Sequence, residues 1–292
     1  MADTFTPIAP RPAPVRTEGL VPWIRRNLFD DWKSGLTTAV LVGLALGAGS
    51  TKGFAHIGVL QQLEKEGVKI DMISGSSMGA IIGAVYCAGT DLEMLERFVL
   101  TLNLRGYMDL QFPLSNGLLR GEKIEELIRL FTHAKSFAET NIPFCCVAVD
   151  AETGKLDVLE EGPLHESVRA SMSIPAIFEP VPLNGKTYID GGVLERVPCK
   201  CLRDHGMDVI VGVDVGYHGN PVDVAGMSAY QLMNRTINIM QWEMTKFRRE
   251  EADVMLVPEV LFVKGHFQTD QAEDCIEEGR RAVRTRCRRF GN

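Results

Sequence analysis

The sequence predicts an α/β fold of three layers, in which helices cover both faces of a mainly parallel central sheet. Short runs rich in β-branched residues alternate along the chain with segments of helical spacing, as they do when helices connect parallel strands. Glu152-Thr153-Gly154 is a predicted hairpin tip between 145–149 and 155–159, so one part of the sheet is expected to be antiparallel. The other predicted strands span residues 40–46, 68–74, 144–150 and 209–214, with a weaker one at 254–257.

Two glycine-rich turns lie between predicted strands and predicted helices. The first, residues 47–53, leads into a helix predicted over 54–66. The second, residues 75–79, opens a helix predicted over 80–88. Both turns follow the carboxyl ends of strands, which is where ligands bind in open α/β sheets.

Composition and charge are those of an ordinary globular protein. The chain has 292 residues, of which 45% are hydrophobic and 24% are charged. Its formal net charge of −7 disfavours a nucleic-acid-binding protein. Seven cysteines, an odd number without a secretory signal, are expected to be reduced thiols in a cytosolic protein. The longest apolar candidate, residues 36–48, is too short to span a bilayer.

The chain divides into a leader and one large domain. Residues 1–38 are predicted to be a proline-rich leader with an amphipathic helix at 22–32, because the first 22 residues hold five prolines and no apolar core. Residues 39–292 are expected to form a single domain, although length alone also allows two.

The second glycine turn has the G-x-S-x-G pattern of a nucleophile elbow. In Gly75-Ser76-Ser77-Met78-Gly79 a tight turn would lift the central serine off the sheet, and side chains at Gly75 and Gly79 would collide across it. Ser77 is therefore the candidate nucleophile. The alternative is a structural turn in which Ser76 or Ser77 caps the following helix.

The first glycine turn predicts an anion site, because its backbone N–H groups and the following helix N-terminus converge on one point. A phosphate-binding P-loop would need Gly-Lys-Ser/Thr, where this chain has Lys52-Gly53-Phe54. A dinucleotide fingerprint would need glycine in place of Lys52. An oxyanion site fits best, with Lys52 as a nearby positive charge. The alternative for Lys52 is a solvated side chain or a local salt bridge.

A third motif, Tyr188-Ile189-Asp190-Gly191-Gly192, places a carboxylate between a short apolar segment and two glycines that allow a sharp turn. Asp190 is a candidate catalytic residue, and the alternative is an ordinary Asp-Gly turn. Cys199-Lys200-Cys201 with His205 suggests a metal site, but zinc needs a second ligand pair that the sequence does not place nearby.

Together and in this order, the three motifs resemble those of the patatin-like phospholipases, in particular the bacterial branch close to the catalytic domain of neuropathy target esterase. The resemblance implies a Ser–Asp dyad, with Ser77 as the acylated nucleophile and Asp190 as the general base. It implies no cofactor and no metal. It covers residues 41–290 and includes the segments 43–47, 53–60, 117–121, 169–175 and 190–194.

The same resemblance implies an oxyanion hole made by the backbone N–H groups of Ala48, Gly49 and Ser50. Patatins have consecutive glycines where this chain has Ala48 and Ser50, and many bacterial relatives have arginine where it has Lys52. Backbone donors survive such changes wherever the dihedral angles do not require glycine. The residues expected to support the three motifs are Gly47, Lys52, Gly53, Gly75, Gly79, Gly191 and Gly192.

The function implied by the resemblance is hydrolysis of a fatty-acyl ester, a phospholipid or lysophospholipid, through an acyl-enzyme. Two alternatives keep the same fold: an acyltransferase that passes the acyl group to an alcohol, and a regulatory protein with a silent site. A third replaces the dyad by a Ser–Asp–His triad that uses His205, His218 or His266.

Two segments are candidates for contact with a lipid surface. The predicted helix at 22–32 has Ile24, Leu28 and Trp32 on one face, and six arginines lie within residues 280–289. The alternatives are packing on the domain for the first and pairing with acidic residues for the second. The expected location is the cytoplasm, with peripheral membrane contact and no nucleic-acid partner. Residues 103–116 are a candidate cap over an acyl groove.

Overall fold

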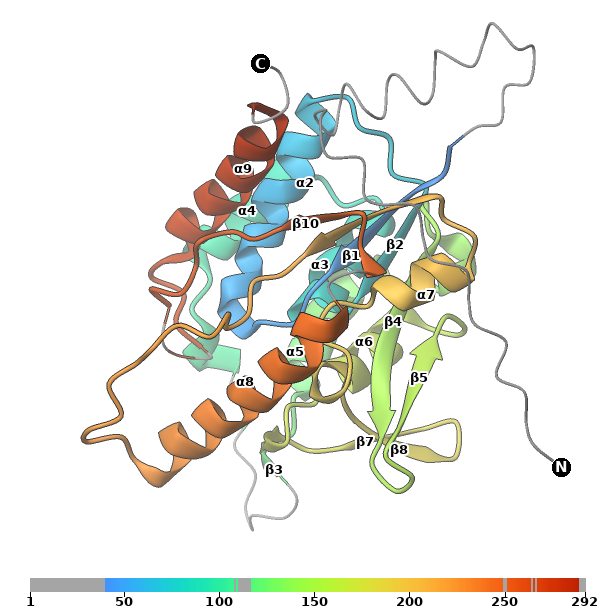
Figure 1. Ribbon diagram of the computed structural model, residues 1–292. Coiled ribbons are helices and arrows are strands. Elements are labelled where there is room, and N and C mark those ends of the chain that lie inside the picture. Colours follow the sequence, from blue (N-terminus) through green and yellow to red (C-terminus); the bar gives the residue numbers. More distant parts are fainter. Residues whose placement is uncertain are drawn as a thin grey trace, which may run out of the picture.

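A mixed sheet forms the centre of the molecule (Figure 1). The computed structural model describes residues 40–107, 109, 117–248, 251–263, 265 and 267–288. The strands of the main sheet are β1 (Val42–Leu46), β2 (Met72–Gly75), β4 (Phe144–Asp150), β5 (Lys155–Leu159), β7 (Val181–Leu183), β8 (Lys186–Asp190), β9 (Val209–Val213) and β10 (Val254–Leu256). Two further strands, β3 (Gly117–Leu119) and β6 (Ala176–Phe178), pair with each other in parallel.

The prediction of a mainly parallel sheet with one antiparallel part is confirmed. Its strand order is β10-β9-β1-β2-β4-β8-β7, with β5 paired to β4 beside this path. The run from β10 to β4 is parallel, whereas β5 and β8 pair antiparallel with β4 and β7 pairs antiparallel with β8. The hairpin at residues 152–154 therefore joins β4 to β5, as the sequence predicts.

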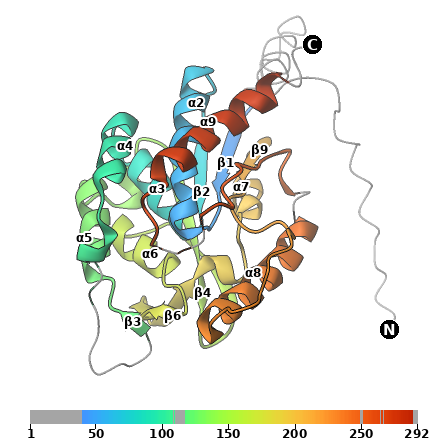
Figure 2. The same ribbon diagram turned by 90° about the vertical axis from the view of Figure 1, so that its left-hand side faces the viewer.

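Helices cover both faces of the sheet, as Figure 2 shows with α4 and α5 on one side of the strands and α7 and α8 on the other. The α-helices are α2 (Ala55–Lys65), α3 (Met78–Cys87), α4 (Leu92–Thr101), α5 (Glu122–Phe131), α6 (Leu164–Ser171), α7 (Cys199–Asp204), α8 (Ala229–Arg248) and α9 (Ala272–Arg288), and the short 3-10 helices are η2 (Ser50–Phe54), η3 (Leu104–Tyr107), η4 (Phe137–Glu139) and η5 (Gly191–Val193).

Alternate side chains of the buried strands point to opposite faces of the sheet, so the apolar core has a part on each face. Leu44 and Leu46 of β1 belong to the large apolar cluster that includes residues of α2, α3, α4 and α9. Ala45, between them, belongs to a smaller cluster with Cys201 and Leu202 of α7. Successive side chains of a strand point to opposite faces, so an uninterrupted apolar run suits a strand that is buried on both sides.

The arginine-rich end of the chain packs on the body of the protein. Helices α2 and α9 approach so closely that a Cβ on Gly58 would lie 1.8 Å from the carbonyl oxygen of Ile276. Arg280 of α9 pairs with Glu96 of α4 at 2.6 Å between Nη2 and Oε2. Pairing with acidic residues is thus observed for Arg280, and binding of this segment to lipid headgroups stays a prediction.

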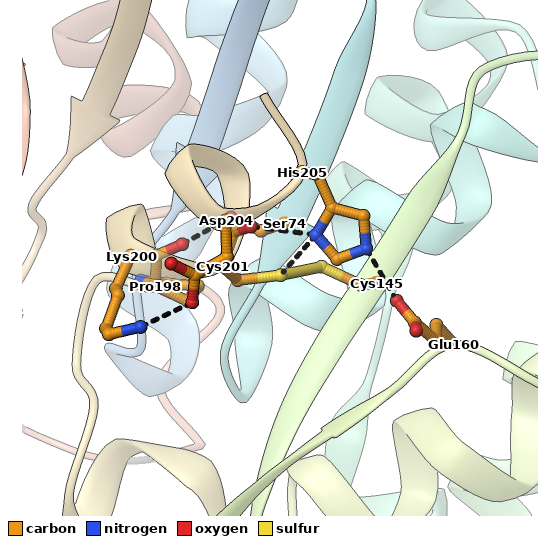
Figure 3. Close-up of a disulfide and its surroundings, with 8 residues drawn as sticks. All are labelled: Ser74, Cys145, Glu160, Pro198, Lys200, Cys201, Asp204 and His205. Carbon is orange, nitrogen blue, oxygen red and sulfur yellow. Dashed lines mark hydrogen bonds and ion pairs between the residues drawn. A yellow bond between two sulfur atoms is a disulfide. The ribbon is translucent and has the colours of Figure 1, made fainter. Parts of the chain in front are cut away.

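The prediction that all seven cysteines are reduced thiols is wrong for two of them. The structure joins Cys145 of β4 to Cys201 of α7 in a disulfide (Figure 3). The two cysteines lie 56 residues apart in the sequence and meet because α7 covers the face of the sheet to which Cys145 points. The remaining cysteines are not bridged: Cys87, Cys146, Cys199, Cys275 and Cys287.

Some segments for which the sequence makes predictions lie outside the residues that the structure describes. The predicted leader, with its helix at 22–32, lies outside them, and so does most of the candidate cap beyond residue 109. Within the described part of the chain, no cluster of His, Cys, Asp and Glu side chains could hold a metal ion. No helix there is long and apolar enough to cross a membrane.

Candidate active site

Ser77 lies in the turn between β2 and α3, at the carboxyl end of the parallel strands. Its φ of 54° and ψ of −118° give a non-glycine residue a strained positive φ, as the turn of a nucleophile elbow requires. Its N–H donates to the buried hydroxyl of Ser171 at 3.1 Å. A Cβ on Gly79 would lie 2.0 Å from the carbonyl oxygen of Leu46, so this turn packs directly against the end of β1.

The Ser77 hydroxyl donates a hydrogen bond to Asp190, with 2.6 Å between Oγ and Oδ2. Both side chains are buried. The other carboxylate oxygen of Asp190, Oδ1, accepts the Gly192 N–H at 2.7 Å. Burial raises the pKa of Asp190 to about 6, although both hydrogen bonds act in the opposite direction. A raised pKa makes a carboxylate a stronger base, so this pair is suited to removing the proton of Ser77.

Strand register explains how two residues 113 positions apart meet. Gly75 at the end of β2 lies opposite Cys146 of β4. Two residues further along β4, Ala148 lies opposite Asp190, the last residue of antiparallel β8. Asp190 is therefore level with the turn that contains Ser77.

Close packing at glycines brings the three motifs into direct contact. A Cβ on Gly191 would lie 2.1 Å from the carbonyl oxygen of Val147, which holds the Asp190 turn against β4. A Cβ on Gly192 would lie 2.8 Å from Cβ of Ala48 in the first motif. Gly53, at the end of the first motif, leaves equally little room beside Met78 of the second motif.

Two backbone hydrogen bonds fix the start of the first motif. The Gly47 N–H donates to the carbonyl oxygen of Val213 at 3.0 Å, and the Ala48 N–H donates to that of Arg196 at 2.8 Å. The Ala48 N–H, one of the three expected oxyanion donors, is therefore already engaged with the protein. The sequence pattern could not show this, because Arg196 lies far along the chain.

The other two expected donors, Gly49 and Ser50, form the turn into η2. The Gly49 carbonyl accepts the Lys52 N–H at 3.2 Å. The C=O and N–H of a trans peptide point in opposite directions, so this bond directs the Ser50 N–H away from that of Lys52. Ser50 and Ser77 line the same cavity. The N–H groups of Gly49 and Ser50 stay predicted as donors to an oxyanion.

Lys52 is the next-to-last residue of the same loop. Burial lowers the pKa of its ammonium group, an effect that Cys275 opposes and Arg196 reinforces. The lysine predicted to add positive charge beside the loop is therefore partly desolvated there.

A buried ion pair that the sequence analysis did not identify lies behind the first motif. Arg196 and Asp214 have side-chain exposures of 2% and 0%, with 2.6 Å between Nη2 and Oδ2. His218 Nε2 lies 3.0 Å from the same oxygen, and the Arg196 guanidinium packs over the ring of Trp242 in α8. Burial alone would raise the pKa of Asp214, but His218 and Arg196 hold it well below its ordinary value. The only signal in the sequence is an acidic residue directly after an apolar strand.

An apolar cavity opens beside Ser77. It has a volume of about 900 Å³, including space that is open to solvent. Its walls come mainly from α3, α4 and α5, and Ser50 and Thr51 stand with Ser77 among its few polar lining residues. Ile81 and Val85 lie one and two turns beyond Ser77 along α3, so the cavity follows this helix away from the serine.

The histidines proposed for a triad have other partners where the structure describes them. His205 Nε2 lies 2.8 Å from Glu160 Oε2, beside the disulfide (Figure 3). His218 faces Asp214. His266 lies outside the described residues. Within the described chain, the partner of the Ser77 hydroxyl is Asp190.

Comparison with known families places all three motifs inside one match. The patatin-like phospholipase family matches this chain over residues 44–202. An NTE family protein of Mycobacterium tuberculosis is 36% identical over 176 residues, which are 60% of this chain and 49% of that protein. The lysophospholipase NTE1 of Candida albicans is 30% identical over 184 residues, which are 60% of this chain and 13% of that protein.

The solved structure of VipD from Legionella pneumophila has a similar fold. It superimposes with a TM-score of 0.60 over 86% of this chain and 67% of that chain, at 11% sequence identity. At this identity the likeness shows a shared fold alone. The match to the mycobacterial relative, by contrast, spans about half the length of that protein.

Proposed function

Because the chain belongs to the patatin-like phospholipase family, we propose that it is a lipid acyl hydrolase that uses a Ser77–Asp190 dyad. The observation that carries the proposal is the 2.6 Å hydrogen bond from Ser77 Oγ to Asp190 Oδ2 at an apolar cavity. Ser77 is the nucleophile, Asp190 the general base, and the N–H groups of Gly49 and Ser50 the oxyanion donors.

The first half-reaction forms an acyl-enzyme. Asp190 takes the hydroxyl proton as Ser77 Oγ attacks the ester carbonyl, and the resulting oxyanion accepts hydrogen bonds from the loop. The tetrahedral intermediate then collapses and the C–O bond to the alcohol breaks. The departing alkoxide takes the proton from Asp190, which leaves the fatty-acyl group esterified to Ser77.

The second half-reaction regenerates the enzyme. Asp190 takes a proton from a water molecule as the water oxygen attacks the acyl carbonyl. The second tetrahedral intermediate expels Ser77 Oγ, which recovers the proton, and the fatty acid leaves. A base whose pKa is about 6 is ionised at neutral pH and still strong enough to accept a proton in both steps.

The cavity supports a fatty-acyl ester as substrate. An apolar hollow that starts at the nucleophile buries hydrocarbon without requiring directional partners. A lysophospholipid or a phospholipid supplies such a chain joined to a glycerol alcohol as leaving group. The name of the Candida albicans relative, a lysophospholipase, favours the same class.

Three variants of the full chain test this proposal on a short p-nitrophenyl ester and on lysophosphatidylcholine. Ser77→Ala and Asp190→Asn are each expected to lower kcat by about 10³-fold or more, because the two groups act as a unit. Ser76→Ala is the matched control, since Ser76 is a buried neighbour whose hydroxyl has no partner among the described residues. It should keep wild-type activity. An inactive wild type, or a Ser77→Ala variant as active as wild type, would overturn the proposal.

A further inference from the structure

A histidine outside the three motifs contacts the first of them. His56 lies near the start of α2 and its side chain is completely buried. Its Nε2 is 2.8 Å from the carbonyl oxygen of Gly47. We propose that His56 is a positioning residue that holds the glycine loop in the geometry needed to bind the oxyanion. The inference rests on the function proposed above.

The protonation state of His56 follows from its partners. A carbonyl oxygen only accepts hydrogen bonds, so Nε2 carries the proton and donates it to Gly47. The other ring nitrogen, Nδ1, is buried without a partner among the described residues. Burial lowers the pKa of His56 to about 4, so the ring is neutral at physiological pH. His56 is therefore a hydrogen-bond donor of fixed direction and not a proton carrier.

The contact acts on one particular peptide of the loop. The Gly47 carbonyl and the Ala48 N–H belong to the same trans peptide and point in opposite directions. His56 holds the carbonyl side, and the carbonyl oxygen of Arg196 holds the N–H side at 2.8 Å. With both ends bonded, the plane of this peptide cannot rotate without breaking a buried hydrogen bond. The next two peptides carry the N–H groups of Gly49 and Ser50, so the place from which these groups start is fixed by this peptide.

His56 itself has little freedom to move. It lies on α2 two residues before Gly58, where a Cβ would lie 1.8 Å from the carbonyl oxygen of Ile276 in α9. On the other side, a Cβ on Gly53 would lie 3.3 Å from the His56 ring. Side chains in a close-packed interior have little room to move, so the His56 ring is a rigid support for the loop.

Loss of the donor should appear in kcat more than in KM. The acyl chain binds in the apolar cavity, which His56 does not line. The oxyanion exists only in the transition state and the tetrahedral intermediates, so a misplaced donor weakens their binding and leaves substrate binding unchanged. A displacement of about 1 Å in such a group costs up to roughly 100-fold in rate.

Three variants separate positioning from mere packing. His56→Leu removes the donor, and the amide of His56→Asn is too short to reach Gly47. The His56→Gln variant carries its amide nitrogen close to the place of Nε2. Each is compared with wild type in kcat and KM for the p-nitrophenyl ester, in inhibition by a boronic acid that forms a tetrahedral adduct on Ser77, and in thermal unfolding.

We expect His56→Leu and His56→Asn to lose about 10- to 100-fold in kcat, with KM within about twofold of wild type. Their inhibition constants for the boronic acid should rise by the same factor as kcat falls, and His56→Gln should recover most of both. If His56→Leu does not fold, the pair of Asn and Gln variants makes the same comparison.

The inference is overturned if folded His56→Leu or His56→Asn keeps wild-type kcat and boronate inhibition, or if His56→Gln is as impaired as they are. A wild type without Ser77-dependent hydrolysis would overturn the proposed function and this inference together, which is a different result.

Discussion

The two sides of Ser77 differ in chemistry. On one side, the end of β8 and the segments that follow η5 and β9 bring buried charged groups to the site: Asp190 bonds Ser77, and Arg196 pairs with Asp214. On the other side, α3, α4 and α5 supply an almost wholly apolar wall. We call these the polar side and the cavity side.

The difference separates two tasks. Chemistry at the ester needs atoms held at hydrogen-bond distance, and buried polar groups are held there by their hydrogen-bond partners. Holding a fatty chain needs apolar area and room, which many combinations of side chains provide. Substitutions on the polar side should therefore cause large losses of stability or activity. Substitutions on the cavity side should instead change the preferred acyl-chain length by degrees.

Breaking the polar side at its buried ion pair should have the largest effect on stability. Arg196→Met leaves the Asp214 carboxylate buried without its cation, which costs about 3–5 kcal/mol in the free energy of unfolding. Denaturant unfolding at pH 7 measures it. Arg129→Met removes a cation of an exposed pair with Glu126 and should leave the free energy of unfolding nearly unchanged. Equal effects of the two substitutions would contradict the distinction between the sides.

The dyad should reduce the stability of the protein above pH 6. A rise in the pKa of Asp190 from 3.8 to about 6 corresponds to roughly 3 kcal/mol. Because the folded-state pKa is the higher one, the folded protein binds the extra proton, and stability is lost as pH rises through 6. Asp190→Asn removes this loss, so it should unfold with a free energy up to about 3 kcal/mol larger than wild type at pH 8.

The gain of Asp190→Asn should vanish at pH 4, where the carboxyl group of folded wild type is already protonated. The exposed Asp204→Asn serves as control and should change little at either pH. A less stable Asp190→Asn variant at pH 8 would show that the carboxylate stabilises the fold instead.

The pH dependence of hydrolysis should report the same group. Only ionised Asp190 can accept the serine proton, so kcat/KM is expected to fall about tenfold for each pH unit below 6 and to be flat just above it. Stopped assays on the p-nitrophenyl ester between pH 4 and 8 measure the profile. An acidic limb near pH 4 would mean that burial does not shift the base.

Narrowing the cavity should have the smallest effect, a loss of activity on long-chain esters only. Val85→Phe adds bulk about 12 Å along α3 from Ser77 and should lower kcat/KM for a p-nitrophenyl palmitate about tenfold, with butyrate unaffected. Val158→Phe, the same change at an exposed position of β5, should alter neither substrate. Equal losses on both esters would mean that the acyl chain does not extend past Val85.

Much of this arrangement could be predicted because it is local. The hairpin at residues 152–154, strand β4 and the two glycine turns are each specified by neighbouring residues, through β-branched runs and turn chemistry. The family likeness carried by the motifs also selected Ser77 and Asp190 as the pair to consider. Boundaries were less accurate: the strand predicted from residue 68 begins at Met72, and the Val68 N–H instead donates to the Leu63 carbonyl of α2.

Contacts between distant segments were beyond the sequence. No local pattern indicates that the Ala48 N–H is engaged by Arg196, that Cys145 meets Cys201, or that Asp214 pairs with an arginine. Each of these depends on strand order, register and the face that a helix covers. Those are properties of the whole chain, because one strand can pair with several others at little difference in local energy.

The sequence by itself determined the chemical groups of this protein: a serine on a tight turn, a carboxylate before two glycines, and a loop of closely spaced backbone donors. The tertiary structure alone decided their distances, that the Ala48 N–H is engaged by Arg196, and that Asp190 is buried enough to raise its pKa to about 6. The reason is physical. Residue type and turn chemistry act over a few neighbours, whereas burial and hydrogen-bond partners are set by segments that meet only when the sheet is assembled.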